Sequence, residues 1–253
     1  MKPREAISAA INAAVAAGRP ALVGFLTAGF PTRREFQDNL AAVLGACDVV
    51  EIGVPFSDPM ADGTTIQRAS FVALTDGVTL PWILEQVAKA PAGPPILLMS
   101  YLNPLLKYGF DKLPHDAAAA GVSGFIVPDL PYEESEELKT ALDREGLALV
   151  QMVTPVTPAD RLAMLCKSAQ GFVYAVTMTG TTGKSAEIPE DVLQYMDRVK
   201  SVSTIPVCAG FGIRSRDQVA RFAAHVDGVV VGSALVETLE RGGDVRAFLG
   251  SLR

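Results

Sequence analysis

The sequence has few of the residues that carry the commonest kinds of protein chemistry. It contains only two histidines, His115 and His225, and both lie in segments with a helical pattern. Most metal sites and many acid–base sites use histidine. Neither a histidine metal site nor acid–base catalysis by histidine is therefore expected here. The three cysteines, Cys47, Cys166 and Cys208, are widely spaced without a CxxC pair, which predicts neither a disulfide framework nor a zinc site.

The chain also lacks an excess of positive charge and any long apolar run. Its 253 residues include 22 Lys and Arg against 28 Asp and Glu, a formal net charge of −6. Binding to nucleic acid or to an anionic membrane surface needs a basic footprint, so neither partner is expected. No apolar run approaches the roughly 20 residues of a membrane span, and the first residues lack the apolar core of a signal peptide. A soluble cytoplasmic protein is expected.

Short apolar runs rich in β-branched residues are abundant. They are mostly continuous instead of alternating, as in strands that are covered on both faces. Helical segments are predicted between them, among them Arg33–Gly45, Pro131–Gly146 and Pro158–Ser168. The eight predicted strands are Ala21–Thr27, Val49–Val54, Ile96–Tyr101, Gly124–Leu130, Ala148–Thr154, Gly171–Thr177, Ile205–Gly210 and Asp227–Gly232.

Eight strand–helix units in about 250 residues match the size of a (β/α)8 barrel. No linker or shift in composition divides the chain, so residues 1–253 are predicted to form one α/β domain, a single TIM barrel. The Ala-rich stretch Pro3–Ala17 predicts an extra N-terminal helix that closes the barrel floor. A doubly wound parallel sheet of eight strands is the alternative that this pattern leaves open.

Two connections are too long to be simple turns, Pro55–Thr65 after the second predicted strand and Met178–Ile188 after the sixth. Both follow the carboxyl end of a strand, which is the end where such barrels hold their active sites. Long loops at this end that are rich in Gly and Thr are candidates for a lid.

Glu51 is the one charged residue in the apolar run VVEIGV. Burial of an ionised carboxylate is costly, so such a group raises its pKa or finds a partner. It is either a general acid–base group in the barrel mouth or a structural carboxyl paired with a neighbouring strand. Asp58 and Asp62 follow in the next loop, where either suits a plain turn. A second carboxylate close behind a buried one also allows divided acid and base roles.

Glycines at the last two predicted strand ends indicate a phosphate site. Gly210-Phe211-Gly212 ends the seventh run and Gly232-Ser233 ends the eighth, directly before a helical segment. In this fold a phosphate often binds between these two loops, through backbone N–H groups at the N-terminus of a short helix. Glycine lets the backbone approach the oxyanion closely. The alternative is that these glycines serve turns alone.

The positions of the lysines narrow the chemistry, because none falls within a predicted strand. A Schiff base held inside the barrel is therefore not expected. What remains is carboxylate acid–base catalysis on a phosphorylated substrate that accepts the electrons itself. An indole ring does so once it is protonated at C3.

A series of motifs, in order over nearly the whole chain, resembles the tryptophan synthase alpha subunit family. Val50–Gln67 (VEIGVPFSDPMADGTTIQ) resembles the family's signature, including both carboxylates. Thr181, Phe30 and Met178 depart from residues common in the family. The other motifs are FLTAGFP (Phe25–Pro31), SYLNPLLKYG (Ser100–Gly109), GFIVPDLPYEES (Gly124–Ser135), YAVTMTGTTG (Tyr174–Gly183), AGFGIRS (Ala209–Ser215) and VVVGSALV (Val229–Val236).

The resemblance implies a lyase that cleaves indole-3-glycerol phosphate into indole and glyceraldehyde 3-phosphate. Glu51 would move protons between the glycerol C3′ hydroxyl and indole C3, and Asp62 would hydrogen-bond the indole N–H. Thr182 would close the loop after the sixth strand and orient Asp62. The remaining substrate-binding candidates are Phe25, Tyr101 and Tyr174 around the indole and glycerol, Gly183, Gly212, Gly232 and Ser233 at the phosphate, and Phe211.

The resemblance also implies a partner, a tryptophan synthase beta subunit that uses pyridoxal phosphate to join indole with serine. The two would form an α2β2 heterotetramer with a tunnel for indole, and this chain itself would bind no cofactor and no metal. Two other functions stay open. One is a non-catalytic subunit that binds phosphate ligands and switches a partner. The other is a phosphosugar isomerase or epimerase, for which the first and fifth predicted strands supply no carboxylate.

Overall fold

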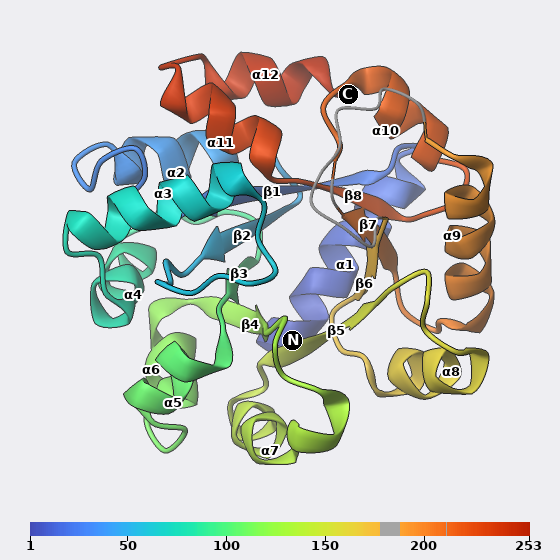
Figure 1. Ribbon diagram of the computed structural model, residues 1–253, viewed down its shortest axis with the longest axis horizontal. Helices are drawn as coiled ribbons and strands as arrows, with labels where there is room; N and C mark the ends of the chain where they lie inside the picture. Colours follow the sequence, from blue (N-terminus) through green and yellow to red (C-terminus); the bar gives the residue numbers. More distant parts are fainter. Residues whose placement is uncertain (178–187, 211) are drawn as a thin grey trace.

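The computed structural model describes residues 1–177, 188–210 and 212–253. Within them, eight parallel strands close into a barrel in chain order, surrounded by helices (Figure 1). The predicted TIM barrel is confirmed, and the doubly wound sheet is excluded because the last strand pairs with the first. The strands are β1 (Ala21–Thr27), β2 (Val49–Gly53), β3 (Ile96–Met99), β4 (Val122–Ile126), β5 (Ala148–Val153), β6 (Val173–Val176), β7 (Val207–Gly210) and β8 (Gly228–Val231).

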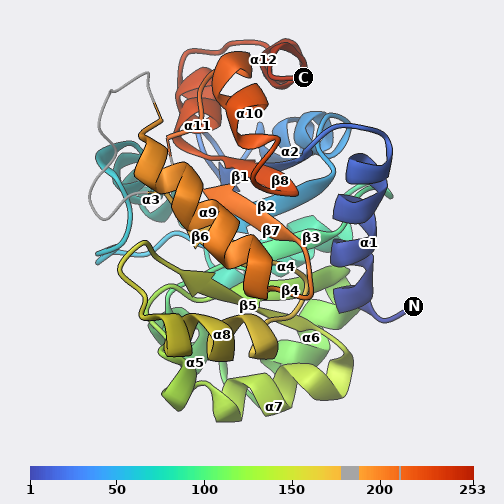
Figure 2. The ribbon, with the colours of Figure 1, turned by 90° about the vertical axis from the view of Figure 1, so that its right-hand side faces the viewer.

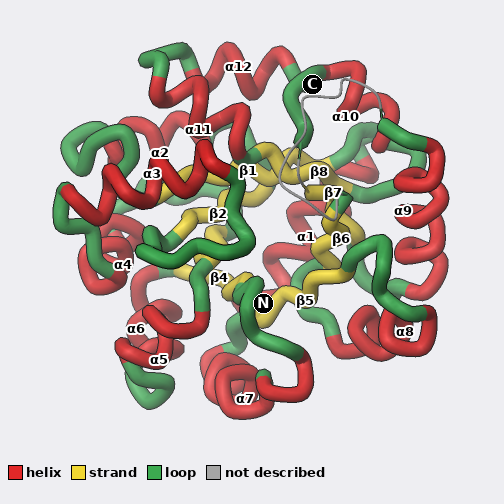
Figure 3. The backbone as a smooth tube through the Cα atoms, viewed as in Figure 1, coloured by secondary structure: helices red, strands yellow, loops and turns green. Residues whose placement is uncertain are grey.

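The helices form the outer layer (Figure 3). The single helix predicted over Pro131–Gly146 is wrong at its start, where a 3-10 turn, Tyr132–Glu134, precedes the α-helix. The Ser135 hydroxyl donates to the Tyr132 carbonyl and closes that tighter turn. The ring is made of α2 (Phe36–Leu44), α3 (Thr64–Thr75), α4 (Leu80–Ala88), α5 (Leu102–Tyr108), α6 (Leu113–Ala120), α7 (Glu136–Glu145), α8 (Ala159–Ser168), α9 (Glu190–Val202), α10 (Arg216–Phe222), α11 (Ser233–Glu240) and α12 (Val245–Ser251).

The predicted N-terminal helix is present as α1 (Pro3–Ala16), which lies across one end of the barrel (Figure 2). Its Arg4 N–H donates to the Gly146 carbonyl, just before β5, and the Ser8 hydroxyl donates to the Gly171 carbonyl, just before β6. Its apolar face packs into the barrel interior. The helix therefore closes the N-terminal end of the barrel and leaves the C-terminal end for a site.

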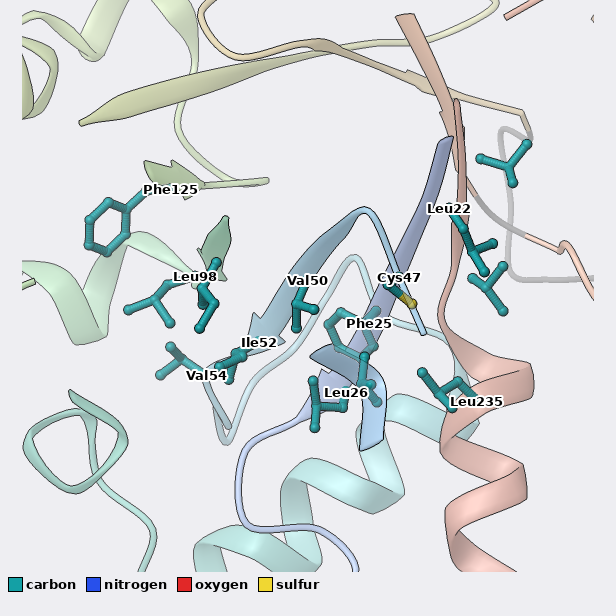
Figure 4. Close-up of a cluster of buried hydrophobic side chains, with 14 of the residues drawn as sticks. Leu22, Phe25, Leu26, Cys47, Val50, Ile52, Val54, Leu98, Phe125 and Leu235 are labelled. Atoms are coloured by element: carbon teal, nitrogen blue, oxygen red, sulfur yellow. The ribbon is translucent and has the colours of Figure 1, made fainter. Parts of the chain in front are cut away.

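Among the described residues, buried apolar side chains form two clusters, one inside the barrel and one between the strands and the helices. Figure 4 shows part of the outer cluster, with Leu22, Val50 and Ile52 from the strands and Leu235 from α11. Val49, by contrast, packs in the inner cluster with α1. Side chains alternate along a strand, so the next inward position on β2 after Val49 is Glu51.

No helix among the described residues combines the length and the apolar character that crossing a bilayer requires.

Candidate active site

Glu51 is the most deeply buried charged group of the candidate site. On β2 it lies in register with Phe25 of β1 and Leu97 of β3. Its exposed fraction is 0%, and neither carboxyl oxygen has a hydrogen-bond partner among the described residues. Burial, reinforced by the nearby charge of Asp62, raises the pKa of Glu51 from 4.5 to about 8. A carboxyl group in such surroundings keeps its proton at neutral pH.

Asp62 belongs to the loop between β2 and α3, and only 8% of it is exposed. The loop folds back on itself there: the Asp62 N–H donates to the Pro59 carbonyl at 3.2 Å, and the Asp62 carbonyl accepts from the Gln67 side chain at 2.8 Å. Desolvation raises the pKa of Asp62 to about 6, and a hydrogen bond from Tyr101 opposes that rise. Asp62 is therefore mostly ionised near pH 7, unlike Glu51.

Tyr101 connects the end of β3 to the loop that carries Asp62. Its hydroxyl accepts a hydrogen bond from the Ala61 N–H at 2.9 Å, and its ring stacks on Phe56 with centroids 5.2 Å apart. The next residue is fixed as well, because the Leu102 N–H donates to the Asp129 carboxylate at 2.9 Å. Asp129 thus serves the start of α5, and Tyr101 holds the segment of Asp62 in place.

Glu51 and Asp62 line one cavity, which encloses about 460 Å³ of free space including its open mouth. Other predicted residues lie around the same cavity: Phe25, Tyr174, Gly212, Gly232 and Ser233. Tyr101 instead lines a smaller neighbouring cavity, which it shares with Phe25 and Asp62. Thr182, Gly183 and Phe211 lie outside the described residues.

The glycines of this cavity leave backbone space at the ends of β7 and β8. Gly212 has a φ of +82°, and no atom lies within 4 Å of the point where a Cβ would stand. Gly232 is the N-cap of α11, and its carbonyl accepts from the Leu235 and Val236 N–H groups. The first N–H groups of a helix and its dipole attract an anion. Gly232 and Ser233 are therefore placed to meet one.

The prediction from sequence missed several residues of the cavity. Met99, Ile66 and Ile213 are apolar neighbours, and no pattern distinguishes them from ordinary core residues. Arg214 also lines the cavity. Its signal was visible, since it is a cation two residues after Gly212 in the motif AGFGIRS.

A larger hollow, with about 1720 Å³ of free space, lies on the β4 and β5 side of the barrel mouth. Its charged groups already have partners: Asp129 accepts from the Leu102 N–H, and Arg161 forms a two-pronged ion pair with Glu133. The cavity around Glu51 is the stronger candidate for chemistry, because its two carboxyls have strongly shifted pKa values. Neither hollow offers a metal site within the described residues, where no cluster of His, Cys, Asp and Glu could hold an ion.

Comparison with known proteins decides the family. The family model described as tryptophan synthase alpha chain matches residues 11–247. The chain belongs to this family. The alpha chain of Solidesulfovibrio magneticus is 46% identical over 248 residues, which cover 96% of both chains. That of Desulfovibrio desulfuricans is 47% identical over 94% of this alpha chain and 96% of its own length.

Solved structures of tryptophan synthase agree with the fold of this alpha chain. A Mycobacterium tuberculosis structure in its aminoacrylate-bound form has a TM-score of 0.89 at 37% identity, over 98% of this chain and 97% of that one. A structure of the α2β2 complex from Pyrococcus furiosus has a TM-score of 0.86 at 34% identity, over 92% and 97%. These TM-scores show that both structures contain the same barrel fold as this chain.

Proposed function

We propose that this alpha chain is a lyase of tryptophan biosynthesis that cleaves indole-3-glycerol phosphate into indole and glyceraldehyde 3-phosphate. The observation that carries the proposal is the pair Glu51 and Asp62, two buried carboxyls on a cavity that also includes Gly212, Gly232 and Ser233. Membership of the alpha chain family supports the same reaction. A phosphate bound at the glycines puts the rest of a small phosphate ester within the reach of the carboxyls.

The two pKa shifts divide the roles of the carboxyls. Near pH 7, Glu51 holds its proton with a pKa of about 8, whereas Asp62 is mostly ionised with a pKa of about 6. Carboxyls whose surroundings separate their pKa values serve as acid and as anion at the same pH. Glu51 is then the proton donor, and Asp62 is the negative charge that accepts a hydrogen bond from the indole N–H.

The reaction needs one carboxyl to donate a proton and then accept another. Glu51 gives its proton to indole C3, which makes the ring a cation whose N–H group bonds to Asp62. Glu51, now a carboxylate, takes the proton of the glycerol C3′ hydroxyl while the C3–C3′ bond breaks. The electron pair of that bond returns to the indole ring, and C3′ becomes the aldehyde carbon of glyceraldehyde 3-phosphate. Glu51 ends protonated, as it began.

The remaining residues would bind and orient the substrate. Phe25 and Tyr174 supply rings beside the carboxyls for the indole, with Tyr101 behind Asp62. Phe211 stays a substrate-binding candidate on the sequence alone. Backbone N–H groups at Gly212, Gly232 and Ser233 suit the phosphate, together with Gly183. Thr182, on the sequence alone, stays the candidate that closes the loop after β6 and orients Asp62.

The proposal extends to the setting in which the alpha chain works. The Pyrococcus furiosus structure is an α2β2 complex, and we propose the same assembly here, with pyridoxal phosphate in the beta subunit and no cofactor or metal in this chain. We also propose a cytoplasmic location for the protein. We further propose that residues 1–253 form one domain.

Indole release by the purified chain tests the reaction, measured with and without a beta subunit. Glu51→Gln should lower kcat by a factor of about 1,000 or more, since general acid–base groups contribute about 10²–10⁴. Asp62→Asn should lose less than Glu51→Gln if a hydrogen bond alone matters, and nearly as much if the negative charge does. Binding of glycerol 3-phosphate should persist in both variants, because the glycines remain.

Asp116→Asn is the matched control, since Asp116 is bonded to Tyr108 on the outer layer of the barrel. It should keep the wild-type rate. Activity of Glu51→Gln within a few-fold of wild type would remove Glu51 from the mechanism. No turnover by the wild-type chain, alone and with a beta subunit, would instead favour a non-catalytic subunit.

A further inference from the structure

Arg214 is a cation on the wall of the candidate cavity that the proposed reaction has not yet used. It follows Gly212 and the buried Ile213 at the end of β7, and it lines the same cavity as Ser233. Its side chain is 44% exposed. Its guanidinium forms a two-pronged ion pair with Glu237, with Nη1–Oε2 and Nη2–Oε1 distances of 2.8 and 2.9 Å.

Glu237 lies one helical turn after Ser233 on α11, so both side chains project from the same side of that helix. The Thr65 hydroxyl in the first turn of α3 donates to its carboxylate at 3.3 Å. The hydrogen bonds from Arg214 are the main reason why the pKa of Glu237 is lowered. A fixed negative charge therefore stands behind the glycine end of the cavity, where a phosphate dianion would meet repulsion unless a cation lay between them.

We infer, on the basis of the proposed function, that Arg214 binds the phosphate group of the substrate while Glu237 holds its guanidinium in place. A guanidinium has five N–H donors in a planar fork, and Glu237 engages two of them, so three remain. Arg214 thereby adds a formal positive charge to a subsite that otherwise offers backbone N–H groups. Charge-assisted hydrogen bonds from arginine to phosphate are among the stronger polar contacts in proteins.

The chain of contacts also joins the two halves of the site. Arg214 bonds to Glu237, Glu237 bonds to Thr65, and Thr65 lies three residues after Asp62, at the start of α3. A phosphate that holds Arg214 in place would thus also restrain the start of α3, directly after the loop that carries Asp62.

Calorimetric titration with glycerol 3-phosphate, the phosphorylated half of the substrate, tests the role of Arg214. Arg214→Gln should weaken binding by about tenfold, the effect of one charge-assisted hydrogen bond that is partly exposed. Arg214→Lys should recover part of the affinity, because it keeps the charge without the fork. Arg241→Gln is the matched control: Arg241 approaches the same Glu237 at 3.8 Å but is 78% exposed, and its loss should leave the affinity within twofold of wild type.

A double variant separates phosphate binding from simple neutralisation of Glu237. If Arg214 only cancels that charge, Arg214→Gln combined with Glu237→Gln should regain wild-type affinity. If Arg214 binds the phosphate, the double variant should stay weak. Wild-type affinity in Arg214→Gln, or recovery in the double variant, would overturn the inference. These titrations need no turnover. If the variants show the expected affinities but the wild-type chain releases no indole, the result would contradict the proposed reaction and not the role of Arg214.

Discussion

Replacement of Glu51 by Gln should make the protein more stable, by an amount that grows with pH. In the folded chain the Glu51 carboxyl keeps its proton up to a pKa of about 8, against an ordinary value of 4.5. Between these two values the unfolded chain has lost a proton that the folded chain still holds. The free energy of unfolding therefore falls as the pH rises through this window. A neutral Gln of the same shape carries no such penalty.

The magnitude follows from the width of the window, since one unit of pKa difference is worth about 1.4 kcal/mol. The Glu51 carboxyl should lower the free energy of unfolding by about 2 kcal/mol at pH 6 and about 4 kcal/mol at pH 8, and hardly at all at pH 4. No reduction for solvent screening applies, because the side chain is fully buried. Glu51→Gln should gain these amounts.

Urea unfolding at the three pH values measures the gain, followed by the fluorescence of Trp82, the single tryptophan. Glu133→Gln is a control of opposite sign. In the wild-type chain the hydrogen bond from Arg161 lowers the pKa of the exposed Glu133 carboxyl to about 2. Glu133→Gln removes that interaction and should therefore lose stability at pH 6 and pH 8 alike. An equal gain for Glu51→Gln at all three pH values, or a loss at pH 8, would refute the burial of an unpaired carboxyl as the cause.

Two further predictions concern catalysis. The kcat/KM for indole release should fall below about pH 6, as Asp62 takes up a proton, and above about pH 8, as Glu51 loses its own; a profile that is flat from about pH 5 to about pH 9 would contradict both shifts. Gly210→Ala should slow indole release by about tenfold or more, because its Cβ would lie 2.2 Å from the Tyr174 ring. Gly250→Ala in α12, where the new Cβ meets no atom within 4 Å, should keep full activity, and equal rates for the two would show that the position of Tyr174 is unimportant.

The bounds of a strand could be predicted where burial on both faces makes its apolar run coincide with the residues that hydrogen-bond in the sheet. For β1 the predicted and observed bounds are the same, Ala21–Thr27. For β4 they differ, since the prediction was Gly124–Leu130 and the strand is Val122–Ile126. Gly121, with a φ of +94°, ends α6 and lets Val122 pair at once with β3. At the other end Pro128 has no N–H for a ladder bond, although the predicted run continued to Leu130.

The direction of Glu51 could not be predicted from its own strand. Both faces of β2 are buried, so the apolar run VVEIGV does not tell which face meets the barrel interior. The register with β1 and β3 decides it. Asp62 depends on a still more distant residue, because Tyr101 from the end of β3 holds the Ala61 N–H beside it. A hydrogen bond between two loops leaves no periodic signal along a chain.

The charged groups at the cavity differ in their surroundings. One is buried without a partner among the described residues, which suits proton transfer, and two others are paired with each other, which suits phosphate binding. Glu51 has no ion-pair or hydrogen-bond partner in the described residues, and this isolation both costs stability and keeps the proton that the reaction needs. Arg214 and Glu237 are paired and partly exposed to solvent, so their desolvation on folding costs little stability. An unpaired acid is useful where a proton moves, whereas a paired cation is useful where a phosphate only binds. Stability lost at Glu51 therefore has a direct counterpart in catalysis, and loss of the Arg214 pair should affect binding far more than folding.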